Sequence, residues 1–172
     1  MGDPQIGCSG SVSSDLAGWQ NTLTQALTKF PNTSFILGAG DQVEDASSED
    51  QYDAFFTPAE LTSTPYIPTI GNHDNGALYA YHFNSPNESA EYGQTSAGGD
   101  YWFTYGNTLY MVLNSNNQSA LSHDTFVGQA IAAAGGDAAW KVVMFHHSIY
   151  SSATPSDDTD ICTRFSTSMT ST

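Results

Sequence analysis

The chain has 172 residues, of which 39% are apolar and 12% aromatic, and this composition suffices for one globular domain. It carries 18 Asp and Glu against 3 Lys and Arg, and the resulting net charge of −15 argues against nucleic acid as a partner. The sequence shows no apolar run of about 18 residues, and no basic segment followed by an apolar run, so we expect neither a membrane partner nor a signal peptide.

The first half of the chain predicts two units in which a helix leads into a strand and a polar loop. In residues 14–30, behind the possible caps Ser13 and Ser14, apolar residues recur at helical spacing: Leu16, Trp19, Leu23, Leu27 and Phe30. Residues 34–37 then predict a buried strand that enters GAGD (residues 38–41). A short helix near residues 49–56 and a strand at residues 66–70 repeat this order before GNHD (residues 71–74).

The second half predicts a β-hairpin, a helix and one further strand. Residues 101–105 and 108–113 alternate as two strand arms around the turn Gly106-Asn107. A helix is expected over residues 122–134, and residues 141–145 form an apolar strand that ends at His146 and His147.

The end of the chain has a different composition. From residue 151 onward Ser, Thr and Asp dominate, and we predict a domain over residues 1–162 followed by a poorly ordered tail at residues 163–172. The two cysteines, Cys8 and Cys162, define neither a disulfide framework nor a zinc cluster, so their pairing stays open.

Metal-ligand residue types follow the predicted strands. They are Asp3 in GDPQIG, Asp41 in GDQVED, Asn72 in GNHD, and His146 in VMFHH. Open α/β sheets collect functional groups beyond the carboxyl ends of their strands, so these segments are expected to converge on one crevice. Mixed oxygen and nitrogen ligands suit zinc, manganese or iron.

These motifs together resemble the calcineurin-like metallophosphoesterase superfamily. The segments GDPQIG, GDQVE, GNHD, YWFTYGN and HHSIYS, spread over residues 2–162, look most like bacterial purple acid phosphatase-like proteins. The resemblance implies an α/β fold, here a partial version of the family's four-layer α/β/β/α sandwich with mixed sheets. It also implies hydrolysis of phosphoesters, with phosphomonoesters as the expected substrates.

The resemblance implies a role for each residue of the candidate site. Asp3 would bind the first of two metal ions, Asp41 would bridge both, and Asn72 and His146 would bind the second. His73 would stabilise or protonate the leaving oxygen, with Asp74 orienting its ring. His147 either faces the substrate phosphate or packs in the protein. His82 and His123 match no ligand motif, and we interpret them as a loop histidine and a residue near a helix start.

The sequence departs from the family pattern at several positions. Gln5 stands where many members have a histidine ligand, and Glu44 stands where purple enzymes have their chromophoric tyrosine, so Glu44 either binds metal or faces solvent. No histidine follows His147, whereas the family closes its site with GHxH, and no strand precedes Asp3. Weak or absent phosphatase activity is therefore expected for this chain, as a truncated member of the family.

Two rival functions follow from the residues themselves. A non-catalytic acidic surface module would use Asp41, Glu44 and Asp45 to bind calcium, but His146 and Asn72 argue against calcium. Acyl transfer is discounted because the chain has no GxSxG motif. The resemblance implies an extracellular or cell-surface location, and the sequence leaves the substrate, the metals and the oligomeric state open.

Overall fold

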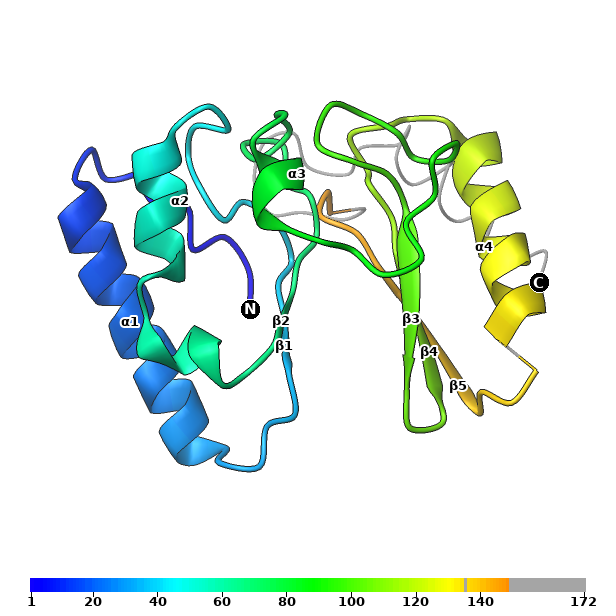
Figure 1. Ribbon diagram of the computed structural model, residues 1–172, viewed down its shortest axis with the longest axis horizontal. Coiled ribbons are helices and arrows are strands. Elements are labelled where there is room, and N and C mark those ends of the chain that lie inside the picture. Colours follow the sequence, from blue (N-terminus) through cyan, green and yellow to red (C-terminus); the bar gives the residue numbers. More distant parts are fainter. Residues whose placement is uncertain (135, 149–172) are drawn as a thin grey trace.

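The computed structural model describes residues 1–134 and 136–148, and within them the elements form four layers. Figure 1 shows α1 (Val12–Lys29) and α2 (Glu49–Phe56) on one side, the strands in the middle and α4 (Ala120–Ala134) on the other side. This arrangement confirms the expected α/β class. The predicted tail at residues 163–172 and Cys162 lie outside the described residues.

The first two layers comprise α1 (Val12–Lys29), α2 (Glu49–Phe56) and a parallel pair of short strands, β1 (Ile36–Leu37) and β2 (Tyr66–Ile67). A 3₁₀ turn, η1 (Ala59–Thr62), lies between α2 and β2. The buried side chains between these helices and β1 are Ile6, Trp19, Leu23, Ile36, Ala54 and Phe55. Trp19 stacks on Phe55 with ring centroids 5.4 Å apart, which fixes α1 against α2.

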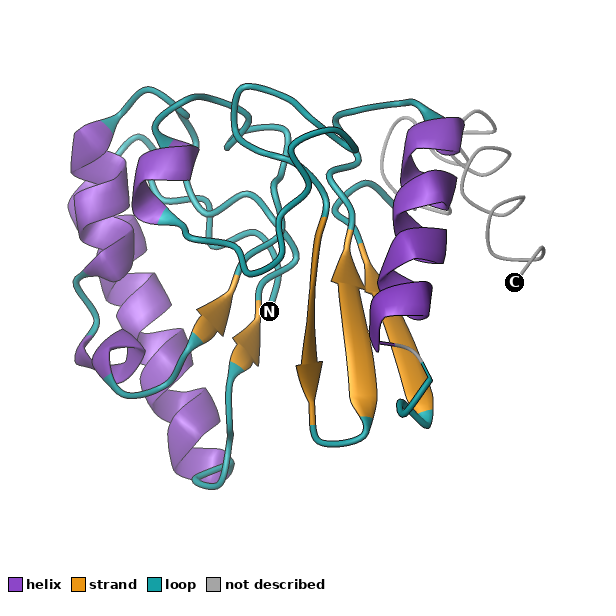
Figure 2. Cartoon of the chain, turned by 45° about the vertical axis from the view of Figure 1, so that its right-hand side comes forward, coloured by secondary structure: helices purple, strands orange, loops and turns teal. Residues whose placement is uncertain are grey.

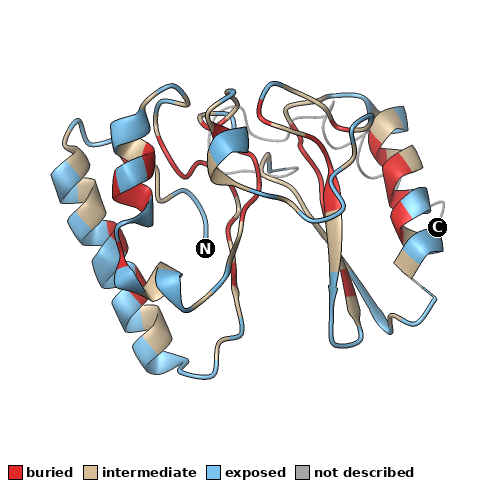
Figure 3. Ribbon diagram, viewed as in Figure 1, coloured by how far each residue is buried: buried red, intermediate tan, exposed pale blue. Residues whose placement is uncertain are grey.

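The other two layers comprise a three-stranded sheet and the helix that covers it. β3 (Tyr101–Tyr105) pairs antiparallel with β4 (Thr108–Val112), and β4 pairs parallel with β5 (Trp140–Met144). Helix α4 (Ala120–Ala134) packs on this sheet through a buried cluster of Leu109, Met111, Leu113, Phe126, Val127 and Ala130. In Figure 3 the buried positions of α4 lie on the side that faces the sheet.

Aromatic side chains join the two sheets. Phe35, next to β1, makes edge contacts with Phe103, Tyr105 and Tyr110 of the β3–β4 hairpin at centroid distances of 5.2 to 5.9 Å. The Tyr101 hydroxyl donates to the Pro68 carbonyl. These contacts within the protein thus hold the two sheets at a defined spacing.

Four strands end at the same edge of the molecule. Figure 2 shows the arrowheads of β1, β2, β4 and β5 directed toward one side, where long loops gather. These loops carry the motifs singled out in the sequence, so the predicted convergence at the carboxyl ends of the strands is confirmed.

Most predicted elements agree with the structure, and the differences are local. Helix α1 is capped by Ser11, whose side chain accepts from the Ser14 amide, instead of by Ser13 or Ser14. Phe30 follows the helix and is 62% exposed, because the chain turns away from the core there. His82 ends a short helix, α3 (Tyr79–His82), instead of lying in a loop. No helix among the described residues is long and apolar enough to cross a membrane.

A buried ion pair anchors α4 to the start of β3. His123 is near the beginning of α4, as expected, and its Nδ1 lies 2.7 Å from Asp100 Oδ2, with both side chains almost fully buried. Its Nε2 lies 2.7 Å from the Asn117 carbonyl oxygen. Burial opposes protonation of the ring, but these two acceptors outweigh it and raise the pKa of His123.

The substitution His123→Gln is expected to lower the free energy of unfolding by about 3 kcal/mol near pH 6, because it leaves Asp100 without its cationic partner. A raised pKa in the folded state means that this contribution is complete below the ordinary imidazole pKa of about 6.5 and is lost as pH rises through the folded value. Urea unfolding of wild type and variant at about pH 6 and about pH 9 tests this, since the difference should shrink at the higher pH. The neighbouring substitution Asp124→Asn serves as a control, and a difference that stays constant would contradict the assignment.

Candidate metal centre

Three of the predicted ligands converge at the carboxyl edge of the strands. Asp3, Asp41 and His146 each offer one ligand atom, and these atoms all lie within 4.8 Å of one another. His146 Nε2 is 3.4 Å from Asp41 Oδ2, and His146 Nδ1 is 3.7 Å from Asp3 Oδ1. Residues distant in sequence are therefore brought together in the way the motifs predicted.

Asn72 completes one side of this group. Its Oδ1 lies 3.0 Å from His146 Nε2, so this imidazole nitrogen is close to both an amide oxygen and the Asp41 carboxylate. His146 Nδ1 lies 2.8 Å from the Ala39 carbonyl oxygen, which can act only as an acceptor. Nδ1 must therefore carry a proton, and Nε2 is the nitrogen left to bind a cation.

The loops around Asp41 have a backbone that most sequences do not adopt. Asp3 and Asp41 have φ values of 47° and 50°, in the left-handed region. The Asp3 amide donates to the Gly40 carbonyl at 3.2 Å, which holds the two loops together. A Cβ on Gly40 would overlap His146 Nδ1, and one on Gly71 would overlap Asp41 Oδ1. Glycine at both positions allows the ligands to approach so closely.

The charges of this group are arranged around Asp41, which is 6% exposed. Burial favours its neutral form, but a hydrogen bond from His146 and the His73 amide at 2.9 Å outweigh burial and lower the pKa of Asp41. Burial likewise opposes the charged form of His146, yet the Asp41 carboxylate and the Ala39 carbonyl raise the pKa of His146 to about 9. In the metal-free protein, a protonated His146 thus supplies the positive charge beside Asp41.

His73, the residue expected to protonate the leaving oxygen, has a different partner from the one predicted. Its Nδ1 lies 2.9 Å from the Glu44 carbonyl oxygen and 3.5 Å from Glu44 Oε2. Asp74 was expected to orient this ring, but its two carboxylate oxygens accept from the amides of Val43 and Gly71. Asp74 therefore connects the two ligand loops through their backbones, and that expectation is corrected.

Two further residues have positions that motif analysis did not predict. Glu44 Oε2 accepts from Gln5 Nε2 at 2.8 Å, so the side chains at the two positions where the sequence departs from the family bond to each other. Asp74 is fully buried, and burial raises its pKa to about 6 although the amides of Val43 and Gly71 favour the charged form. Neither arrangement has a signal in the local sequence, because each depends on how the loops fold together.

His147 lies beside the ligand His146 with a ring centroid distance of 5.1 Å. Its Nδ1 is 2.7 Å from Ser115 Oγ, and the same hydroxyl accepts from its backbone amide at 3.2 Å. Ser115 was not singled out in the sequence, and it fixes both the backbone and the ring of His147.

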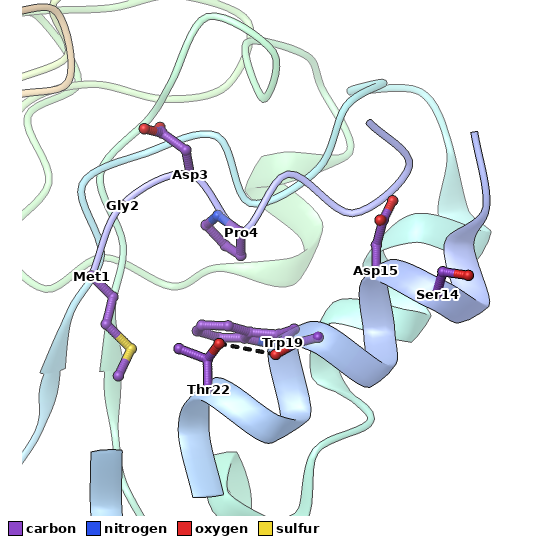
Figure 4. Close-up of a pocket in the computed structure, with 9 residues that line it drawn as sticks. Met1, Gly2, Asp3, Pro4, Ser14, Asp15, Trp19 and Thr22 are labelled. Atoms are coloured by element: carbon purple, nitrogen blue, oxygen red, sulfur yellow. Dashed lines mark hydrogen bonds between the residues drawn. The ribbon is translucent and has the colours of Figure 1, made fainter. Parts of the chain in front are cut away.

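A pocket of about 420 Å³ adjoins Asp3. Figure 4 shows Trp19 and Thr22 of α1 on one side of it and Met1 and Pro4 on the other, with the Asp3 carboxylate directed away from Trp19. Asp3 is consequently more open than Asp41, with 57% of its side chain exposed.

A family model described as calcineurin-like phosphoesterase matches residues 11–168 of the chain. The match covers every candidate site residue except Asp3, and the chain belongs to this family. A search of curated proteins gave no match. The family supports metal-dependent hydrolysis of phosphoesters as the general activity, and it uses divalent metals.

The residues present fit a divalent metal. The donors are carboxylate oxygens, an amide oxygen and one imidazole nitrogen whose other nitrogen is held by a carbonyl, which is the set preferred by manganese, iron or zinc. Gly40 and Gly71 leave room beside the donors that a Cβ would fill. The nitrogen donor makes calcium a poorer fit.

The substitution Gly71→Ala is expected to weaken metal binding by at least about tenfold, because the added Cβ must displace Asp41 Oδ1. Titration calorimetry with Mn²⁺ measures the change. Gly128→Ala in α4 is the matched control, since its Cβ meets nothing within 4 Å and it should be neutral or stabilising by up to about 1 kcal/mol. Equal affinity in both variants would mean that Asp41 does not bind the metal.

Metal affinity is expected to rise with pH up to about 9, because a cation at Nε2 must displace the proton that His146 carries below its raised pKa. Below that value, each rise of one pH unit should strengthen Mn²⁺ binding by up to about tenfold. Calorimetry in buffers of different ionisation enthalpy counts the protons released. The variant His146→Gln should bind more weakly and release fewer protons; unchanged proton release would exclude His146 as a ligand.

Proposed function

We propose that this site hydrolyses phosphomonoesters with a pair of metal ions, as in the purple acid phosphatase-like branch of the family. The observation that supports this best is the convergence of Asp41 Oδ2, Asn72 Oδ1 and His146 Nε2, with Asp3 on the other side of His146. In this proposal Asp3 belongs to the first ion, Asn72 and His146 belong to the second, and Asp41 is shared.

Bound metal would supply Lewis acidity toward the phosphate and a water of lowered pKa. The chain's own residues contribute position and protons. Asp41 is held by the His73 amide at 2.9 Å, and Asp74 holds the amides of Val43 and Gly71, so the loops that carry Asp41 and Asn72 have a fixed spacing. Such fixed donors are what a site needs to orient a phosphoester for in-line attack.

His73 is the candidate proton donor to the leaving oxygen. The Glu44 carbonyl accepts from Nδ1, which leaves Nε2 as the nitrogen that can face a substrate. The Glu44 carboxylate lies 3.5 Å from Nδ1 and so adjoins the same side of the ring. His147 is proposed to contact the phosphate, since its ring lies beside that of His146 and its Nδ1 is 2.7 Å from Ser115 Oγ.

Elemental mass spectrometry of the purified chain, after loading with zinc, manganese or iron and removal of excess metal, tests the proposal first. About two equivalents are expected in wild type, and Asp41→Asn should lose most of them because it removes the shared carboxylate. Metal-dependent turnover of p-nitrophenyl phosphate is expected to be weak in wild type and to be lost in the same variant.

The outcomes separate the candidate functions. Absence of both bound metal and turnover would contradict the proposal. Bound ions without turnover, or a preference for calcium, would favour the alternative of a non-catalytic acidic metal-binding module. Glu44→Gln, which keeps the Glu44 carbonyl, is a useful comparison because it should slow turnover while leaving the metal content unchanged.

A further inference from the structure

One short segment contacts the neighbours of both ligands on the second-ion side. The segment is Asn114-Ser115-Asn116, which follows β4, and Asn114 and Ser115 are 2% and 3% exposed. Asn116 Nδ2 donates to the Gly71 carbonyl at 3.0 Å, and Gly71 directly precedes Asn72. Ser115 Oγ accepts from the His147 amide at 3.2 Å, and His147 directly follows His146. Adjacent residues of one segment thus hold the backbones on which the two ligands are carried.

The segment is itself fixed from behind. The Asn114 amide donates to Asp100 Oδ1 at 2.8 Å, and its side-chain amide donates to Thr95 Oγ1 and the Gly98 carbonyl. Asn114 Oδ1 in turn accepts from the amide and the side chain of Asn116. Since Asp100 is also the partner of His123, the segment is tied to α4 through a buried polar network.

We propose that Ser115 and Asn116 are positioning residues that set the distance between Asn72 and His146 and thereby the affinity of the site for its metal. Asn72 Oδ1 and His146 Nε2 are 3.0 Å apart. Within the described part of the chain, no backbone hydrogen-bond ladder joins β2, which leads to Asn72, to β5, which leads to His146. The Asn116 side chain bridges the two sheets at this point by donating to the Gly71 carbonyl, and Ser115 holds the backbone after β5 by accepting from the His147 amide. The inference rests on the proposed metal centre, and it concerns the affinity of that centre instead of its chemistry.

Titration calorimetry with Mn²⁺ on the full chain tests the proposal. Ser115→Ala and Asn116→Ala should each weaken binding by about tenfold or more, the effect typical of removing a group that orients a metal ligand. Ser115→Thr keeps the hydroxyl and should restore the wild-type affinity. Asn117→Ala is the matched control, because Asn117 makes two comparable bonds, to Gln94 and Ser119, and neither touches a ligand loop.

A melting temperature recorded for each variant separates a loss of positioning from a general loss of stability. Asn117→Ala is expected to lower the melting temperature as much as Asn116→Ala does while keeping its metal affinity. Ser115→Ala removes a single oxygen atom and keeps the test decisive even if Asn116→Ala does not fold.

The variants Asn72→Ala and His146→Ala distinguish a failure of the positioning role from a failure of the metal centre itself. If these two variants lose Mn²⁺ binding while Ser115→Ala and Asn116→Ala keep it, the positioning role is wrong and the metal centre stands. If Asn72→Ala and His146→Ala also bind Mn²⁺ like wild type, or wild type binds none, the metal centre and the positioning role are both wrong.

Discussion

The arrangement of the site depends on one buried carboxylate, that of Asp41. It lies where loops from both sheets meet, and its two oxygens contact the His73 amide and the His146 ring. A buried carboxylate is stable only with hydrogen bonds and a positive charge nearby. The His73 amide supplies the first, and either a protonated His146 or a bound cation supplies the second. The close approach of Gly71 and the position of the 71–74 loop follow from this requirement.

Backbone strain is concentrated in the loops that meet around Asp41. Asp3, Gln5 and Asp41 have positive φ values, and each such residue costs of the order of 1 kcal/mol or more. The cost is offset by hydrogen bonds between the two loops, from the amides of Gln5 and Ile6 to the carbonyls of Asp41 and Gln42. Two loops that distort together in this way hold Asp3 and Asp41 more rigidly than separate turns would.

The sequence was sufficient to predict the main helices and strands, although not α3 or η1, and to predict which loops would meet. Apolar patterns and the rule that strand ends converge are local or topological properties. Asp41, Asn72 and His146 were predicted on that basis, and the structure brings them together. The partner of His73 was not predictable from the sequence. Asp74 and Glu44 both carry a carboxylate, and the packing of the loops decides which of the two residues lies beside the His73 ring. Ser115 and Asn116 carried no signal, since a polar residue after a strand is ordinarily a turn residue.

Because the chain is strongly acidic, the proposed metal would also change the charge that a substrate meets at the site. A phosphate ester is an anion, and it would approach a molecule of net charge −15 at a site that already contains Asp3, Asp41 and Glu44. Metal binding at His146 Nε2 would displace the proton on that ring, so a divalent ion would add about one positive charge there, not two. One ion would therefore leave the site negative or near neutral, and a second ion beside Asp3 would make it attractive to phosphate. On the proposed function, substrate binding should be more sensitive to the occupancy of the Asp3 side than the ligand count alone suggests, because that ion decides the sign of the local field.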